Sequence, residues 1–193
     1  FGPDGMLYAT TGDAGRGALA QDLNSLNGKI LRMNADGSVP SDNPFPGSLV
    51  YSYGHRNPQG LAWHPETGQL YATEHGPSGE RGLCCRDEVN VIVPGANYGW
   101  PEVVAGEGAE GVTPPVATSG SSATWAPAGA AFYTGSALPG WQGSLLFGTL
   151  RGQHLHRLVL ERETVVGDEL LFANVYGRLR EVAMGPDGHL YVT

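Results

Sequence analysis

A short phrase of the sequence returns four times at nearly constant spacing, and this repeat limits the possible folds more than any other feature. In each copy a Pro/Gly turn precedes an alternating apolar segment, which is typical of a hairpin that leads into a half-buried strand. The prolines of the four copies stand 62, 62 and 59 residues apart; they are Pro3, Pro65, Pro127 and Pro186. Repeats of this length predict a β-propeller, or a related radial array, built from four-stranded units.

A little over three such repeats fit between residues 1 and 193. A propeller buries the faces of its sheets by closing a ring, and three blades alone would leave two sheet edges open. We therefore expect residues 1–193 to be a partial β-propeller, a segment of one all-β domain. The complete ring is expected to have six blades and to belong to a longer protein.

The composition favours many tight turns between short strands, because the chain has 30 Gly, 14 Pro and only 16% charged residues. A net charge of −8 argues against a nucleic-acid or anionic-membrane partner, since both bind clustered Lys and Arg. No apolar stretch approaches the roughly 18 residues of a membrane-spanning helix, so no membrane span is expected.

Alternating apolar runs that end at turn residues predict twelve short strands. These are 7–11, 29–34, 50–53, 60–64, 70–74, 89–93, 129–134, 144–149, 154–160, 169–172, 182–185 and 190–193. Functional residues concentrate on long connections between strands. Such connections are predicted at 13–28, 35–47, 76–87, 97–124 and 161–168.

The two cysteines, Cys84 and Cys85, are adjacent, which excludes a zinc knuckle or a Cys-x-x-Cys redox motif. Two states stay open: a strained vicinal disulfide in an oxidising compartment, or two free thiols in a loop.

The segment GHRNPQGL at 54–61 offers one cation and two amides from a turn that proline stiffens. Arg56, Asn57 and Gln59 would suit a carbonyl-rich ligand, or the segment is a polar loop that caps a strand. His55 is expected to be a structural hydrogen-bonding residue.

Two further segments have oxygen ligands of the kind that calcium takes. The main-chain carbonyls of Gly76 and Pro77 follow a predicted strand and could be neutral ligands. Asp87 and Glu88 form an acidic pair at a strand entrance, which either binds a second calcium ion or is simply solvated. The residues alone favour solvation slightly.

Three of the few positive charges are candidates for an anion site: Arg151 after a strand, and Arg178 with Arg180. Residues i and i+2 of a strand share a face, so Arg178 and Arg180 would repel each other unless an anion lay between them. The alternative is pairing with surface carboxylates such as Glu181. Motifs of hydrolases, proteases and nicotinamide dehydrogenases are missing from the sequence.

Six motifs, in this order, resemble the glucose/sorbosone dehydrogenase family of soluble sugar dehydrogenases that use pyrroloquinoline quinone. They are GHRNPQGLA at 54–62, EHGP at 74–77, DEVN at 87–90, NYGWP at 97–101, AP at 126–127 and GRLR at 177–180. The resemblance covers residues 1–193 and implies a six-bladed propeller of four-stranded antiparallel sheets.

The resemblance also implies roles for residues of this chain. Arg56, Asn57 and Gln59 would be the catalytic set, with the first two facing the quinone carbonyls. The positions that match contacts to the cofactor's carboxylates are Thr124, Arg151, Arg178 and Arg180. Residue 151 is Lys in the best-known members, so the charge is kept while its geometry changes.

By the same resemblance, the carbonyls of Gly76 and Pro77 hold the Ca²⁺ that also binds the cofactor. Glu88 and the carbonyl of Tyr98 resemble ligands of a second, structural Ca²⁺ site. In this family the general base is a histidine a few residues before the turn at 1–5, so the base is expected upstream of this chain and residues 1–193 alone are expected to be inactive.

The expected function is oxidation of the C1 hydroxyl of an aldose to a lactone, with hydride transfer to the quinone. Arg56 and Asn57 would stabilise charge on the quinone oxygens, and an external electron acceptor would reoxidise the cofactor. A periplasmic or secreted monomer or homodimer is expected. The rival hypotheses are a calcium-dependent lactonase and a propeller that binds a ligand without catalysis.

Overall fold

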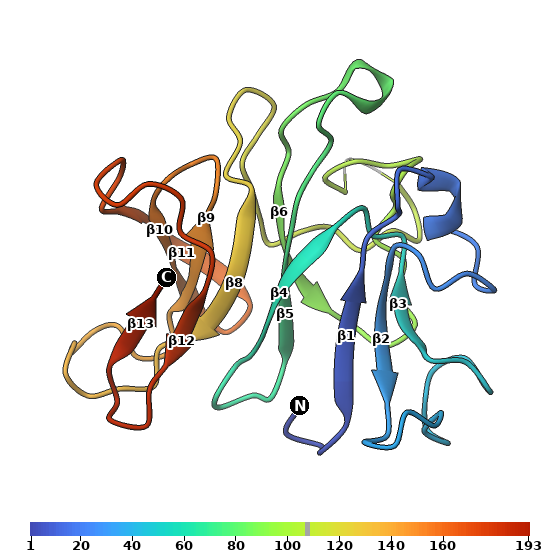
Figure 1. Ribbon diagram of the computed structural model, residues 1–193, viewed down its shortest axis with the longest axis horizontal. Helices are drawn as coiled ribbons and strands as arrows, with labels where there is room; N and C mark the ends of the chain where they lie inside the picture. Colours follow the sequence, from blue (N-terminus) through green and yellow to red (C-terminus); the bar gives the residue numbers. More distant parts are fainter. Residues whose placement is uncertain (107–108) are drawn as a thin grey trace. The chain divides into compact units, whose positions relative to one another are not determined.

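The computed structural model describes residues 1–106 and 109–193, and this part of the chain is all-β (Figure 1). Residues 107 and 108, within the predicted connection 97–124, lie outside the described residues. Thirteen strands are found in the described ranges: β1 Leu7–Thr11, β2 Lys29–Met33, β3 Val50–Tyr53, β4 Pro58–Trp63, β5 Leu70–Glu74, β6 Glu88–Ile92, β7 Ala117–Thr118, β8 Pro127–Phe132, β9 Leu145–Thr149, β10 Leu155–Glu161, β11 Thr164–Leu171, β12 Val182–Met184 and β13 Leu190–Val192. Two short 3₁₀ helices, η1 Gly17–Ala20 and η2 Glu80–Gly82, lie in loops.

The strands form four sheets in which neighbours in the chain are neighbours in space. Their orders are β1-β2-β3, β4-β5-β6-β7, β8-β9-β10-β11 and β12-β13. The all-β class and the four-stranded antiparallel sheets of the prediction are therefore confirmed. The chain divides into two compact units: unit 1 comprises Phe1–Pro58 and Ile92–Pro115, and unit 2 comprises Gln59–Val91 and Val116–Thr193.

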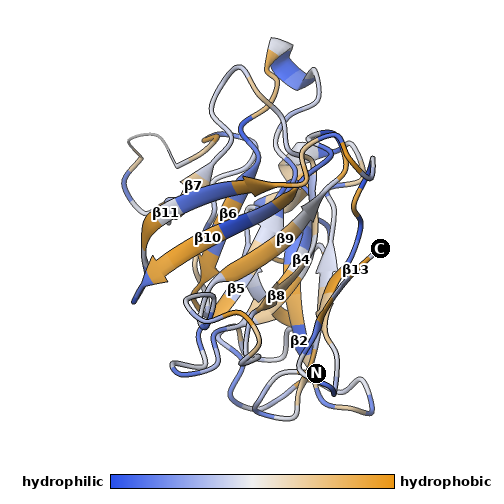
Figure 2. Cartoon of the chain, turned by 90° about the vertical axis from the view of Figure 1, so that its left-hand side faces the viewer, coloured by the Kyte–Doolittle hydropathy of each residue, from blue (hydrophilic) through white to orange (hydrophobic). Residues whose placement is uncertain are grey.

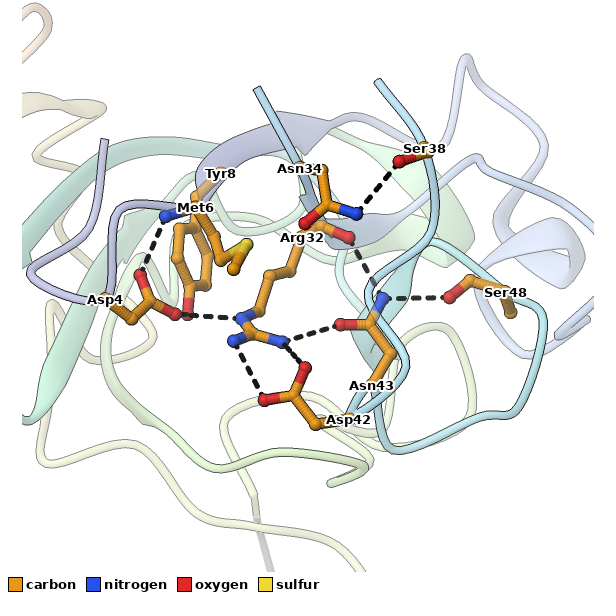
Figure 3. Close-up of polar contacts among 9 residues, drawn as sticks. All are labelled: Asp4, Met6, Tyr8, Arg32, Asn34, Ser38, Asp42, Asn43 and Ser48. Atoms are coloured by element: carbon orange, nitrogen blue, oxygen red, sulfur yellow. Dashed lines mark hydrogen bonds and ion pairs between the residues drawn. The ribbon is translucent and has the colours of Figure 1, made fainter. Parts of the chain in front are cut away.

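Unit 1 is organised around the sheet β1-β2-β3, and a buried arginine ties its loops together. The Arg32 side chain on β2 contacts two carboxylates, with Nε 2.9 Å from Asp4 Oδ2 and Nη1 2.8 Å from Asp42 Oδ1. Nη1 also donates to Asn43 Oδ1 at 3.0 Å, and Asn43 donates back to the Arg32 carbonyl (Figure 3). The turn that opens the first repeat is thus held to the loop between β2 and β3.

Unit 2 has two apolar cores, and β9 contributes to both because successive side chains of a strand point to opposite faces. Leu145 and Phe147 belong to the first core, with Tyr71, Val89 and Leu158 among its members. The second core contains Leu146 together with Tyr133, Leu155, Leu179 and Val182. Figure 2 shows most of β9 and the later part of β10 in the hydrophobic colour.

Two expectations about the strands are wrong. The predicted connection 161–168 is mostly strand, because β11 begins at Thr164 and pairs with β10 directly after a tight turn. The third copy of the repeat is not equivalent to the second. Pro127 begins β8, the first strand of its sheet, whereas Pro65 lies in the turn between β4 and β5.

Candidate functional site

In unit 1, the first residues of the GHRNPQGL motif follow β3 directly, and packing fixes their conformation. Gly54 has φ +77°, and a Cβ there would overlap the Asn97 side chain, so glycine is required. His55 is fully buried, stacks on Tyr98 with ring centroids 4.5 Å apart, and lies within hydrogen-bond distance of Ser52 Oγ. His55 is therefore structural, as expected.

The next two residues, Arg56 and Asn57, are partly exposed and lie against the segment that follows β1. The Asp13 amide donates to the Arg56 carbonyl at 2.8 Å, and a Cβ on Gly12 would lie 3.0 Å from Asn57 Oδ1. The Arg56 guanidinium lies 5.9 Å from the ring centroid of Trp100, whose Nε1 donates to Asp13 Oδ2 at 2.7 Å. Packing on an indole orients the arginine without a carboxylate partner being required.

In unit 2, Gln59 is exposed on β4 and is followed by a close approach of two strands. The Gly60 amide donates to Thr73 Oγ1 at 3.0 Å, and this hydroxyl donates to the Ala128 carbonyl at 2.6 Å. A Cβ on Gly60 would overlap that carbonyl, so the glycine lets β8 approach β4.

Gly76 and Pro77 are both buried in the loop after β5. A Cβ on Gly76 would overlap the carbonyl oxygens of Cys85 and Arg86. The backbone of residues 85–86 therefore packs directly against the Gly76 backbone. The Gly76 amide donates to Asp87 Oδ1 at 2.9 Å. The main-chain carbonyls of Gly76 and Pro77 are neutral oxygen groups of the kind that calcium takes as ligands.

The expectation that Asp87 and Glu88 are solvated is wrong, because both are buried, at 3% and 9% exposure. The Glu88 carboxylate accepts a hydrogen bond from Asn90 Nδ2 at 3.0 Å, and the same amide lies 3.4 Å from Glu74 Oε2. The second residue proposed for that calcium site, Tyr98, is buried in unit 1, where its hydroxyl accepts from the Val93 amide.

The segment 124–126 connects Asp87 to Arg151. Asp87 Oδ2 accepts from Thr124 Oγ1 at 2.8 Å and from the Trp125 and Ala126 amides. The Trp125 carbonyl in turn accepts from the Arg151 amide at 3.1 Å. Because an ionised carboxylate only accepts, the Thr124 hydroxyl hydrogen is committed to Asp87 and cannot also be donated to an anion.

Arg178 and Arg180 are exposed on either side of buried Leu179, in a segment that lies outside any strand. The Leu179 amide donates to the Thr149 carbonyl at 3.1 Å, which joins the segment to the end of β9 just before Arg151. Arg178 lines a cavity of about 320 Å³. The other lining residues are Leu155, Phe172, Tyr176, Leu179, Val192 and Thr193.

Hydrogen bonds of unit 2 join several predicted site segments in a series. Asp87 accepts from Gly76 and Thr124, and the Trp125 carbonyl accepts from Arg151. Thr149, two residues before Arg151, accepts from Leu179, which lies between Arg178 and Arg180. Three arginines, Arg151, Arg178 and Arg180, therefore lie on segments that backbone hydrogen bonds join. In the described ranges no three His, Cys, Asp or Glu side chains gather to hold a metal, whereas main-chain carbonyls such as those of Gly76 and Pro77 are a type of ligand that calcium accepts.

Cys84 and Cys85 are free thiols next to this series, the first exposed and the second buried. A hydrogen bond with Cys84, together with burial, raises the pKa of the Cys85 thiol. Among the described residues no helix has the length and apolar character needed to cross a membrane.

Comparisons with known proteins identify the family to which this chain is similar. The sequence profile of "Glucose / Sorbosone dehydrogenase" matches residues 1–193. The chain is 35% identical to aldose sugar dehydrogenase YliI of Escherichia coli K12, over all of this chain and 54% of that protein. It spans about half the length of the curated relatives it matches over its full extent.

Two solved structures are similar over the full length of the chain. The PQQ-bound form of aldose sugar dehydrogenase from Streptomyces coelicolor is 44% identical with a TM-score of 0.86, and 53% of that chain is covered. An oxidoreductase (glucose dehydrogenase) of Thermus thermophilus is 50% identical with a TM-score of 0.89, and 57% of that chain is covered. The sheets of this chain are accordingly blades of a partial β-propeller.

Proposed function

Because the chain belongs to the glucose/sorbosone dehydrogenase family, we propose that the protein oxidises the C1 hydroxyl of an aldose to a lactone, with pyrroloquinoline quinone and Ca²⁺ as cofactors. The observation that carries the proposal is the hydrogen-bonded series that joins the Gly76 loop to the segments of Arg151, Arg178 and Arg180. A periplasmic or secreted location and an external electron acceptor are part of the proposal.

When bound, the quinone supplies the two-electron oxidant, and Ca²⁺ polarises it as a Lewis acid. The residues of this chain bind and orient. Arg151, Arg178 and Arg180 take the carboxylates of the cofactor, and the carbonyls of Gly76 and Pro77 hold the metal. Thr124 lines the site, while its hydroxyl is engaged by Asp87.

Arg56 and Asn57 have a different task, which is to stabilise negative charge that develops on oxygen during the reaction. Stacking on Trp100 and contact with Gly12 hold the two side chains before substrate arrives, so little reorganisation is needed. Gln59 is proposed to belong to the catalytic set, and Glu88 and the Tyr98 carbonyl are each proposed as ligands of structural Ca²⁺. The proton acceptor is proposed to be a histidine outside residues 1–193.

A titration of the intact protein tests the proposal. Pyrroloquinoline quinone should bind, with a change in its absorbance, only when Ca²⁺ is present, and aldose should then reduce the bound cofactor. Equal cofactor affinity with calcium and with a chelator would remove the metal from the proposal. Cofactor binding without sugar oxidation would favour a binding module, and calcium-dependent hydrolysis of lactones without cofactor binding would favour a lactonase.

A further inference from the structure

Asp87 lies just before β6, and its buried carboxylate accepts hydrogen bonds from two other segments of the chain. Its Oδ1 accepts from the Gly76 amide at 2.9 Å. Its Oδ2 accepts from Thr124 Oγ1 at 2.8 Å, the Trp125 amide at 2.6 Å and the Ala126 amide at 2.9 Å. Only 3% of the residue is exposed, so its charge is held by these four donors rather than by water.

The donors come from two segments that are far apart in the sequence. Gly76 stands 11 residues before Asp87, and Thr124 stands 37 residues after it. The Gly76 backbone is also confined from another side, where the carbonyls of Cys85 and Arg86 leave no room for a Cβ. One carboxylate therefore fixes the loop of Gly76 and Pro77 relative to the segment 124–126.

We propose that Asp87 is the positioning residue of the cofactor site, which aligns the calcium-binding carbonyls of Gly76 and Pro77 with the segment that leads to Arg151. This inference rests on the proposed function. Asp87 itself is neither a ligand nor a catalytic residue, because its oxygens are occupied by protein donors. Its contribution is to hold the loop of Gly76 and Pro77 in a fixed position relative to the segment 124–126 before calcium and quinone bind.

The variant Asp87→Asn tests this inference in the intact protein. An amide cannot accept at both positions, so the variant loses the bond to Gly76 or those to segment 124–126. The calcium concentration that half-saturates loading of pyrroloquinoline quinone, measured by absorbance, should rise at least tenfold. With both cofactors saturating, the KM for aldose should stay within about twofold of wild type.

Asp4→Asn is the control, because it removes the negative charge that pairs with Arg32 in unit 1. It should lower Tm and leave calcium-dependent loading unchanged. If Asp87→Asn does not fold, Thr124→Val gives the same information, because the valine lacks the hydroxyl that donates to Asp87 and should load poorly.

The outcomes separate the two proposals. A wild-type protein that never binds the quinone contradicts the proposed function, and the inference about Asp87 with it. A wild-type protein that binds the quinone while Asp87→Asn, or Thr124→Val, loads it at the wild-type calcium concentration leaves the function intact and overturns the role of Asp87.

Discussion

The imidazole Nε2 of His154 lies 3.1 Å from Nδ1 of His156 inside the third sheet of the chain. The Nε2 of His156 lies in turn 2.8 Å from Oδ1 of Asp168 on β11, and its ring stacks on Phe147. The His156 residue is 1% exposed. Burial lowers the pKa of His156 to about 4, and this effect outweighs the neighbouring carboxylate, which acts in the opposite direction.

Acid should therefore destabilise the fold through His156. Its pKa is about 4 when folded and about 6.5 in the unfolded chain, so the unfolded state binds more protons between these values. The stabilisation is complete above pH 6.5 and is lost as the pH falls towards 4, by about 3 kcal/mol. Urea unfolding of wild type and His156→Gln from pH 7 to 4 measures this loss in the free energy of unfolding. The free energy of unfolding of His156→Gln should depend less on pH than that of wild type. His189→Gln changes an exposed histidine and should behave like wild type.

Loss of either exposed arginine at 178 or 180 should weaken cofactor binding. Arg178→Ala and Arg180→Ala should each cost roughly 1.5–3 kcal/mol of holoenzyme formation, the scale of a hydrogen bond to a charged group. Tm of the cofactor-free protein should change little. Cofactor titration checks this, with Arg162→Ala in the exposed turn before β11 as control. Unaltered affinity in both variants would remove these arginines from the site.

Arg32→Met should destabilise the protein without affecting the cofactor. The guanidinium is buried and bonds to Asp4, Asp42 and Asn43, and the substitution removes all of these charge-assisted hydrogen bonds (Figure 3). We expect a loss of about 2–4 kcal/mol in the free energy of unfolding. Chemical denaturation measures this value, and a loss below about 1 kcal/mol would contradict the structural role of Arg32.

The two adjacent thiols should differ in reactivity. Cys84 is exposed, whereas Cys85 is buried and its pKa is raised, so less of Cys85 is present as the reactive thiolate. Peptide mapping after brief alkylation of the folded protein at pH 8 should find the label on Cys84 first. Equal labelling of both residues would contradict the burial of Cys85.

Much of the sheet structure is predictable because its signal is local. The strands Leu7–Thr11, Val50–Tyr53 and Leu70–Glu74 have the predicted bounds, since each is an alternating run between turn residues. The strand Thr164–Leu171 resembles a loop over 164–168 in its sequence, because it is a largely exposed edge strand with Asp168 and Glu169 in it. Pairing with β10, rather than an apolar pattern, makes it a strand.

The motifs nominate Arg56, Gly76 and Arg178 as site residues from the sequence alone, and these roles stay predictions. The hydrogen bonds among the segments could not be predicted in the same way. The burial of Asp87 is not predictable, since three of its four donors lie 37 to 39 residues away and only the folded chain brings them together. An acidic pair before a strand has the same local pattern whether it is solvated or buried.

The alternation along β9 has a consequence for how unit 2 unfolds. Leu145 and Phe147 belong to one core and Leu146 to the other, so a shift of this single strand disturbs both at once. Neither core can be lost while the other keeps its full complement of side chains. The sheets of unit 2 should consequently melt in one cooperative transition rather than one blade at a time.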